Sequence, residues 1–235
     1  MNFIGLFEGV VGILFLWLGV PHLLKLLQIA GLRRYCRSSK VIVLTYDDGP
    51  GKVLTPALLN LLASNNVHAN FFMIGSKVES FPTQVLDVIA QGHAIGSHSF
   101  RHLHAWKYNP FKVLRDIHAG FRICKQNSFT NWFRPPFGKM TLASLLYTWI
   151  SHHKLAWWTI DSTDTWSSPL AIEKIIERVR KEGGGVVLMH DNDRSDIGRH
   201  DYVLNITLGL IQLARKEGFN ICTLQDKFLN PKMSE

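Results

Sequence analysis

Residues 41–50 read VIVLTYDDGP, and this stretch determines how the rest of the chain is arranged. Its first six residues are apolar, β-branched or aromatic, which is typical of a β-strand. Two carboxylates and a Gly-Pro turn follow at once. The stretch therefore predicts the first strand of the domain, with Asp47 and Asp48 at its carboxyl end.

Similar short runs recur along the chain, and helical stretches separate most of them. We expect strands at 41–46, 67–74, 93–98, 131–134, 155–160, 186–190 and 219–224. We expect helices near 54–64, 82–91, 110–126, 140–153, 169–182 and 202–217. This alternation predicts a parallel α/β sheet. About 185 residues are too few for an eight-unit barrel. The expected fold is a distorted, incomplete (β/α)7 barrel, with an open doubly wound sheet as the alternative.

The chain before this domain is strongly apolar. From Gly9 to Leu24 it contains no Lys, Arg, Asp or Glu, and an extension back to Phe3 gives enough length to cross a bilayer. No basic residue precedes the run and no small-residue cleavage site follows it, which disfavours a signal peptide. We expect residues 1–39 to form a membrane anchor with a basic juxtamembrane segment, and residues 40–235 to form one catalytic domain. A buried core helix is the alternative, and Pro21 leaves open whether the anchor spans the membrane or lies on it.

The charges around the apolar run predict its orientation. No Lys or Arg precedes the run, and five follow it: Lys25, Arg33, Arg34, Arg37 and Lys40. Basic flanks normally stay in the cytoplasm, so the domain is expected to face the cytoplasm.

Composition excludes two other classes of protein. The net charge of +8 comes from 26 Lys and Arg residues spread along 235 positions, with no basic run interleaved with aromatics, so no nucleic-acid partner is expected. Cys36, Cys124 and Cys222 are odd in number and widely spaced, which supports neither a disulfide framework nor a thiolate zinc site.

Polar residues follow the predicted strands at the points where each strand ends. They are Asp47 and Asp48 after the first strand, His98 and His102 after the third, Arg134 at the fourth, Asp161 and Asp164 after the fifth, and His190 at the sixth. In barrels of this type the active site is built at the carboxyl ends of the strands. We therefore expect these side chains to meet at one mouth.

The residue types at this mouth suit one kind of chemistry. Two histidines and a carboxylate leave open positions on a zinc-like cation, which is the arrangement for hydrolysis by an activated water. A second carboxylate oriented by an arginine can take a proton from that water, and a histidine held protonated by an aspartate can give one to the leaving group. Amine leaving groups need such a proton, so amide hydrolysis is the predicted reaction.

The five motifs TYDDGP, HSFRH, RPPF, DSTDTW and LMH occur in that order. They resemble the ordered motifs of the polysaccharide deacetylase family, which is also called the NodB-homology domain or carbohydrate esterase family 4. The resemblance covers roughly residues 40 to 225 and implies the same distorted seven-unit barrel.

The resemblance also implies a role for each motif residue. The implied ligands of a divalent metal, expected to be Zn²⁺, are Asp48, His98 and His102. The implied catalytic residues are Asp47 as general base, Arg134 holding that base, His190 as general acid and Asp164 supporting it. The implied substrate-binding residues are Phe137, whose backbone N–H helps to stabilise the oxyanion, and Trp166, which forms a wall of the pocket. Thr165 separates Asp164 from Trp166, unlike the usual family pattern, so Asp161 is the alternative partner of His190.

The expected function is a membrane-anchored, metal-dependent hydrolase of a bacterial inner membrane. Its substrate would be an N-acylated, most simply N-acetylated, amino sugar that is free, polymeric or lipid-linked. The alternatives are a deformylase of a lipid-linked amino sugar and a deacetylase of an exported cell-wall polymer. The full set of ligand, acid and base residues disfavours a non-catalytic carbohydrate- or lipid-binding module.

Four further aspartates lie beside this set. Asp191, Asp193, Asp196 and Asp201 do not follow the spacing of a calcium-binding EF-hand loop. We expect them to lie in a solvated, mobile loop.

Overall fold

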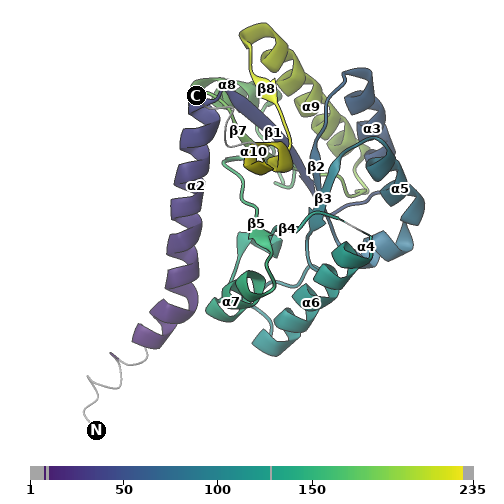
Figure 1. Ribbon diagram of the computed structural model, residues 1–235. Coiled ribbons are helices and arrows are strands. Elements are labelled where there is room, and N and C mark those ends of the chain that lie inside the picture. The colour runs from purple at the N-terminus through teal and green to yellow at the C-terminus, as the bar shows by residue number, and fades with distance from the viewer. Residues whose placement is uncertain (1–7, 9–10, 128, 230–235) are drawn as a thin grey trace.

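The computed structural model describes residues 8, 11–127 and 129–229 of the chain. Its strands are β1 (Val41–Asp47), β2 (Asn70–Met73), β3 (Ala94–Ser97), β4 (Trp132–Phe133), β5 (Lys154–Leu155), β6 (Ile160–Asp161), β7 (Gly185–His190) and β8 (Asn220–Ile221). They form one parallel sheet in the order β5-β4-β3-β2-β1-β7-β6, and β8 pairs with the start of β1 (Figure 1). The predicted parallel α/β architecture is confirmed.

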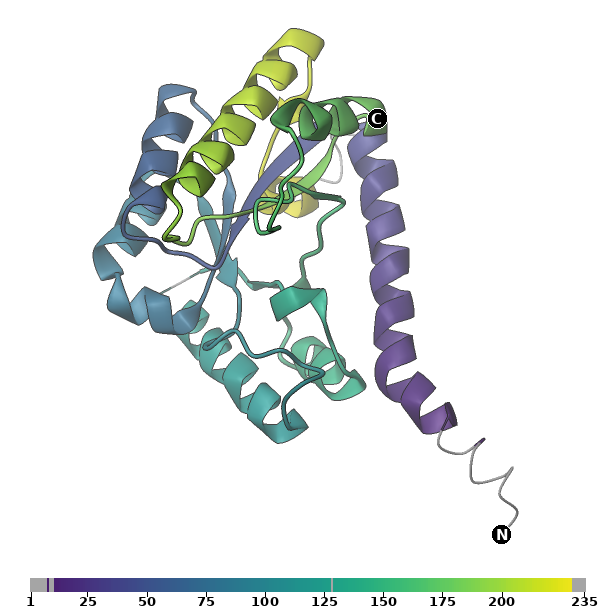
Figure 2. The same cartoon turned by 180° about the vertical axis from the view of Figure 1, so that it is seen from behind.

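Helices surround the sheet, as the views in Figures 1 and 2 show. They are α2 (Val20–Ser38), α3 (Leu54–Ser64), α4 (Gly75–Ser80), α5 (Pro82–Ala90), α6 (Pro110–Gln126), α7 (Leu142–Ile150), α8 (Ile172–Glu182), α9 (Ile197–Glu217) and α10 (Leu224–Leu229). Local sequence fixes several ends. Asn109 caps α6 by accepting from the N–H of Phe111 (2.9 Å), and Gly183 ends α8 in the left-handed conformation. The short helices α4 and α10 were not expected.

Strand β1, predicted at 41–46, is at the centre of the sheet and is buried along its whole length. Successive side chains of a strand point to opposite faces of the sheet. Ile42, Leu44 and Tyr46 belong to the main core, which includes buried residues of α3, α5, α8 and α9. Val41 and Val43 belong to a second cluster on the concave face. Both faces of the central strand are therefore covered.

The predicted strand at 155–160 is wrong, and the way in which it is divided shows that the two edges of the sheet lie close together. Residues 155–160 do not form a single strand, because Leu155 pairs within β5 and Ile160 pairs within β6. These strands are at opposite edges of the sheet, yet only residues 156–159 separate them. Five Cα–Cα steps reach at most about 18 Å. The sheet therefore curls into an incomplete barrel, with a seam along residues 156–159.

Helix α2 lies along this seam. Trp157 Nε1 donates to Gln28 Oε1 (2.6 Å), and Arg33 Nη2 donates to the carbonyl oxygen of Thr159 (3.3 Å). Cys36 is buried in the concave cluster together with Val41, Val43, Phe72, Trp132, Ala156, Val186 and Leu224. The carboxyl-terminal half of α2 is thus packed against the domain and closes the open side of the barrel.

The helix that contains α2 is the candidate membrane segment. It runs from Val11 to Ser38, 28 residues, and it is long and apolar enough to cross a membrane, although a signal sequence meets the same criteria. The start of the predicted anchor, residues 1–7 and 9–10, lies outside the described residues. Pro21 does not break the helix, because the π-helical turn η1 (Phe15–Gly19) precedes it. Such a turn widens the backbone where the proline ring would otherwise meet a carbonyl group.

Candidate active site

The sheet register brings the predicted site residues to one mouth. Asp47 and His190 are paired across β1 and β7 at the carboxyl ends of both strands. The N–H of Arg134 donates to the carbonyl oxygen of Ser97 (2.9 Å), which places Arg134 beside the end of β3. Residues from five separate segments therefore converge, although no local sequence pattern links them.

Asp47 and Arg134 form a buried ion pair. Arg134 Nη1 donates to Asp47 Oδ1 (2.7 Å) and to Thr45 Oγ1 (2.8 Å). The Arg134 side chain is fully buried, and its guanidinium carbon lies 4.1 Å from the ring centroid of Phe72. This pairing compensates the charge of the Asp47 carboxylate and fixes its orientation. The second oxygen of Asp47 lies 3.7 Å from His98 Nε2 and faces the mouth.

Asp48, His98 and His102 form the candidate metal-ligand group. Asp48 Oδ1 lies 3.4 Å from His98 Nε2 and 3.2 Å from His102 Nε2, and the two histidine nitrogens are 3.1 Å apart. His98 Nδ1 donates to the carbonyl oxygen of Arg134 (2.7 Å), so the lone pair of Nε2 is available to a metal ion. Asp48 (φ 68°) and His102 (φ 59°) adopt left-handed backbone conformations that are strained for such residues.

The electrostatics of this group fit a bound cation. Asp48 Oδ1 is buried and accepts no hydrogen bond within the described structure. Burial alone would raise the pKa of Asp48, but His98 and His102 lower it overall. Burial and the neighbouring His98 lower the pKa of His102 to about 4. A carboxylate oxygen and two imidazole nitrogens within 4.8 Å of one another are what a divalent ion requires.

His190 lies on the other side of the mouth, paired with Asp164. Its Nδ1 donates to Asp164 Oδ1 (3.0 Å), and its backbone N–H donates to Asp164 Oδ2 (3.0 Å). Burial would lower the pKa of His190, but the Asp164 carboxylate, followed by Asp47 and Asp48, raises it to about 9. Asp161, the alternative partner, instead accepts from the N–H of Thr163 (2.7 Å). The inserted Thr165 therefore does not displace Asp164 from His190.

The aromatic residues near the mouth differ in their surroundings. Phe137 is half exposed, has a left-handed backbone (φ 57°), and packs with its ring 4.5 Å from that of His102. Trp166 is also half exposed, on the loop that follows β6. Trp157 is buried and bonded to Gln28, so it is not available to a sugar ring.

The loop after β7 contains two aspartates whose contacts the sequence did not reveal. Asp191 is fully buried, which raises its pKa to about 7, and it accepts from Thr55 Oγ1 (2.6 Å). Asp193 accepts from the backbone N–H groups of Lys52 (2.6 Å) and Leu54 (2.9 Å) at the start of α3. The expectation of a solvated loop is therefore wrong for Asp191, which is buried, and for Asp201, which lies in α9. Asp191 also donates its backbone N–H to the carbonyl oxygen of Asp47 in TYDDGP (3.0 Å), whereas Asp193 contacts the residues that follow this motif. Only the fold shows these contacts, because the partners lie about 140 positions apart in sequence.

Comparisons with known proteins agree with this site. Residues 34–148 match the polysaccharide deacetylase family model. A peptidoglycan-N-acetylglucosamine deacetylase of Bacillus cereus is 32% identical over 201 residues, covering 80% of this chain and 88% of that protein. A chitooligosaccharide deacetylase of a Bradyrhizobium species is 27% identical over 195 residues, covering 78% and 88% of the two chains. A crystal structure of a peptidoglycan N-acetylglucosamine deacetylase superposes with a TM-score of 0.72 at 24% identity, over 81% and 88% of the two chains.

The chain belongs to the polysaccharide deacetylase family, as its five motifs suggested. It is a carbohydrate N-deacetylase, a hydrolase of amide bonds, built on the incomplete (β/α)7 barrel of carbohydrate esterase family 4.

Proposed function

We propose that this protein uses a divalent metal ion to remove the acetyl group from an N-acetylated amino sugar at a membrane. One observation carries the proposal: the Asp48, His98 and His102 ligand atoms lie within 4.8 Å of one another, with a carboxylate on one side and a protonated histidine on the other. When bound, the ion polarises the acyl carbonyl and makes water more acidic. Its ligand set, two imidazoles and one carboxylate, favours Zn²⁺.

Asp47 is the proposed general base. Its Oδ1 is held by Arg134, so Oδ2 remains directed at the mouth to receive a proton from the attacking water. The new C–O bond forms as this proton leaves the water. Arg134 touches Asp47 and is fully buried, so we assign it to positioning of the base.

His190 is the proposed general acid. Asp164 keeps it protonated near neutral pH, so it can deliver a proton to the amine nitrogen as the C–N bond breaks. The products are acetate and a free amino sugar. We assign support of the oxyanion to the backbone N–H of Phe137, whose ring packs on that of His102; this role does not depend on the side chain.

Acetate release tests this proposal directly. The full-length protein, purified in detergent and loaded with Zn²⁺, should release acetate and free amine from N-acetylglucosamine oligomers, and a chelator should stop both until Zn²⁺ is returned. Equal release before and after complete removal of metal would sink the metal-dependent mechanism. A formyl-sugar substrate, assayed in parallel for formate, decides between the acetyl and formyl alternatives.

We also propose, from the flanking charges, that the domain faces the cytoplasm. Lys25, Arg33 and Arg37 also contact the domain itself, which gives these basic residues a second role. An impermeant thiol reagent should fail to label Lys216→Cys, an exposed position, in intact cells when Cys222 is replaced by serine. Ready labelling would place the domain outside and support the exported-polymer alternative.

A further inference from the structure

The amino-terminal part of the long helix extends past the mouth of the barrel. Residues 39–40 join α2 to β1, so the helix runs back along the domain opposite to β1 (Figure 1). Lys25 marks the level of the mouth, because its Nζ donates to the carbonyl oxygen of Gly138 (3.0 Å) in the loop after β4. Residues 11–24 continue beyond it for about 21 Å of helix. A membrane that holds this apolar part lies on the mouth side of the domain.

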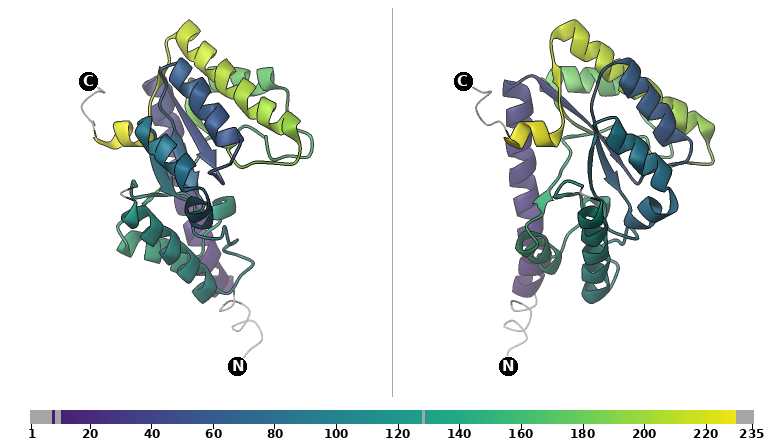
Figure 3. Two further views of the ribbon diagram at one scale, coloured as in Figure 1. Left: turned by 90° about the vertical axis from the view of Figure 1, so that its right-hand side faces the viewer. Right: turned by 45° about the vertical axis from the view of Figure 1, so that its right-hand side comes forward.

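A groove of about 790 Å³ lies between α2 and α7. The ribbons of these two helices lie near each other in Figure 3, and the helices are in contact. Its apolar lining includes Leu24, Leu32, Leu145, Leu146, Trp149 and Trp157. Trp149 and Leu146 are 74% and 46% exposed. In the amino-terminal half of α2, four leucines are exposed as well: Leu23, Leu24, Leu26 and Leu27. The volume is typical of a ligand-binding cavity. An open apolar groove that continues onto a membrane helix suits a hydrocarbon chain.

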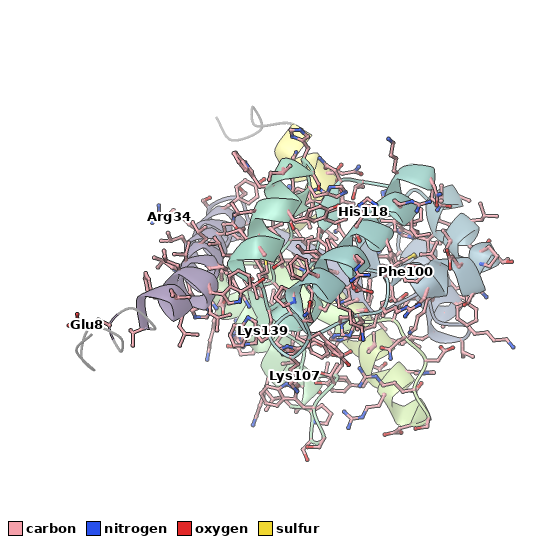
Figure 4. The ribbon with its side chains drawn as sticks, turned by 90° about the horizontal axis from the view of Figure 1, so that it is seen from below. Glu8, Arg34, Phe100, Lys107, His118 and Lys139 are labelled. Atoms are coloured by element: carbon pink, nitrogen blue, oxygen red, sulfur yellow. The ribbon has the colours of Figure 1, made fainter. Side chains whose placement is uncertain are left out.

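Lys25, beside this groove, and Lys139, next to the Gly138 carbonyl group that Lys25 contacts, lack an acidic partner. Lys25 Nζ lies 5.0 Å from the ring of Trp157, a residue of the groove. Among the described residues, no Asp or Glu oxygen lies within 4.0 Å of either ammonium group. Lys139 is on the side of the domain nearer to α2, away from His118 (Figure 4). The Lys139 ammonium group lies 4.3 Å from the ring of Trp106. Two neighbouring cations without an acidic partner attract an anionic group such as a phosphate.

The loop Pro136–Gly138 connects these lysines to the catalytic residues. The Trp158 ring lies 5.0 Å from Lys25 Nζ and 5.8 Å from the Arg134 guanidinium. On the other side of the loop, Phe137 packs on His102. The path therefore runs from the apolar groove, past Lys25 and Lys139, to the metal-ligand group. A lipid-linked sugar has its parts in the same order: the hydrocarbon chain, the phosphate and the sugar ring.

We propose that the substrate is an N-acetylated amino sugar linked through phosphate to a polyprenyl chain, with the chain in the groove between α2 and α7 and the phosphate at Lys25 and Lys139. This inference rests on the deacetylase activity proposed above and adds the class of its carrier. The hydrolysis itself is unchanged: the acetyl C–N bond breaks, and the phosphate linkage stays intact.

A side chain placed in the groove tests this inference. A Cβ at Gly31, which lines the groove, meets no atom within 4 Å, so Gly31→Phe fills the groove without a backbone clash. Gly12, on the same helix but away from the groove, has equally open surroundings and supplies the matched control Gly12→Phe. Acetate release is measured from polyprenyl-diphosphate N-acetylglucosamine in detergent and from a soluble N-acetylglucosamine tetramer.

The ratio of the two rates, lipid-linked to soluble, should fall at least tenfold in Gly31→Phe and stay at the wild-type value in Gly12→Phe. An unchanged ratio in Gly31→Phe overturns the inference and indicates that bulk membrane lipid alone covers the groove. If the wild-type protein deacetylates only the soluble tetramer, the carrier is wrong and the deacetylase function stands. If it deacetylates neither, the proposed function fails.

Photolabelling gives a readout that is independent of activity. A polyprenyl phosphate with a photoreactive group in its chain should label α2 and α7 peptides in the wild-type protein. Excess unlabelled polyprenyl phosphate should compete, and Gly31→Phe should reduce the labelling severalfold. Labelling that is uniform over the apolar helix and insensitive to competitor contradicts a specific site.

Discussion

His102 and His190 lie at the same mouth of the barrel, yet their surroundings shift their pKa values in opposite directions. Burial and His98 lower that of His102 to about 4, so its imidazole is neutral and available as a ligand. Asp164, followed by Asp47 and Asp48, outweighs burial at His190 and raises its pKa to about 9. The partner group, and not the residue type, therefore separates a ligand side from an acid side of one active site.

Removal of a ligand should have the largest effect, because a three-ligand site cannot spare one. His102→Ala is expected to reduce the bound divalent ion from about one per chain to a small fraction, with deacetylation at background. Elemental analysis and acetate release measure the two effects. His104→Ala, two positions away and outside the ligand group, is the control and should keep its ion. Full ion content in His102→Ala would mean that the ligand side is misassigned.

The adjacent aspartates should separate base from ligand. Asp47→Asn cannot accept a proton, so acetate release should fall by about 10²–10⁴ while the ion stays bound. Asp48→Asn should instead lose the ion, because its Oδ1 faces both histidines. Ion analysis of the two variants side by side makes the comparison. Loss of the ion from both would show that Asp47 belongs to the ligand side.

The loss of the general acid should slow a reaction more when its leaving group needs a proton. His190→Gln is expected to slow amide hydrolysis by about 10² or more and to keep the ion. An activated aryl acetate, whose leaving group needs no proton, should be affected much less. Steady-state rates on both substrates provide the measurement, and equal losses on amide and ester would argue against a proton donor at position 190.

The acid side should also set the alkaline limit of activity. His190 must be protonated to act, so kcat should decline as the pH rises through about 9. Asp164→Asn removes the carboxylate that raises this pKa, and the decline should move to lower pH. The same proton stabilises the fold: its contribution is complete below about pH 6.5, the ordinary histidine value, and is lost as the pH rises through about 9. An alkaline limb that stays in place in Asp164→Asn would contradict the pairing.

The smallest effect should come from loss of Asp193, which links the loop after β7, on the acid side, to the segment after β1, on the ligand side. Asp193, after β7, accepts backbone N–H groups at the start of α3, after β1. Asp193→Ala should lower the free energy of unfolding by about 1–2 kcal/mol, as for loss of a helix cap, and reduce activity modestly. Asp196→Ala removes a cap of α9 on the same loop and is the control. A larger fall in kcat for Asp193→Ala than for Asp196→Ala, at equal loss of stability, would reveal its positioning role.

The sequence predicted the first strand, the parallel sheet and the polar strand ends, because each is encoded locally. VIVLTY is a short run of apolar, β-branched and aromatic residues, which is typical of a strand; that this strand is central was decided by the sheet topology. The motif histidines and aspartates stand directly at strand ends, where a parallel barrel builds its site. The missed elements are short: β5 and β6 have two residues each, too few for a periodic pattern to distinguish from a single strand at 155–160.

By itself, then, the sequence determined the family, the barrel class and which residue types reach the mouth. Tertiary structure decided the rest. Asp164, and not Asp161, reaches His190, because Asp161 bonds within its own turn. Asp191 is buried against Thr55, and α2 closes the seam between β5 and β6. Each of these outcomes depends on contacts between segments far apart in the chain, and on the burial that those contacts create, which no local pattern encodes.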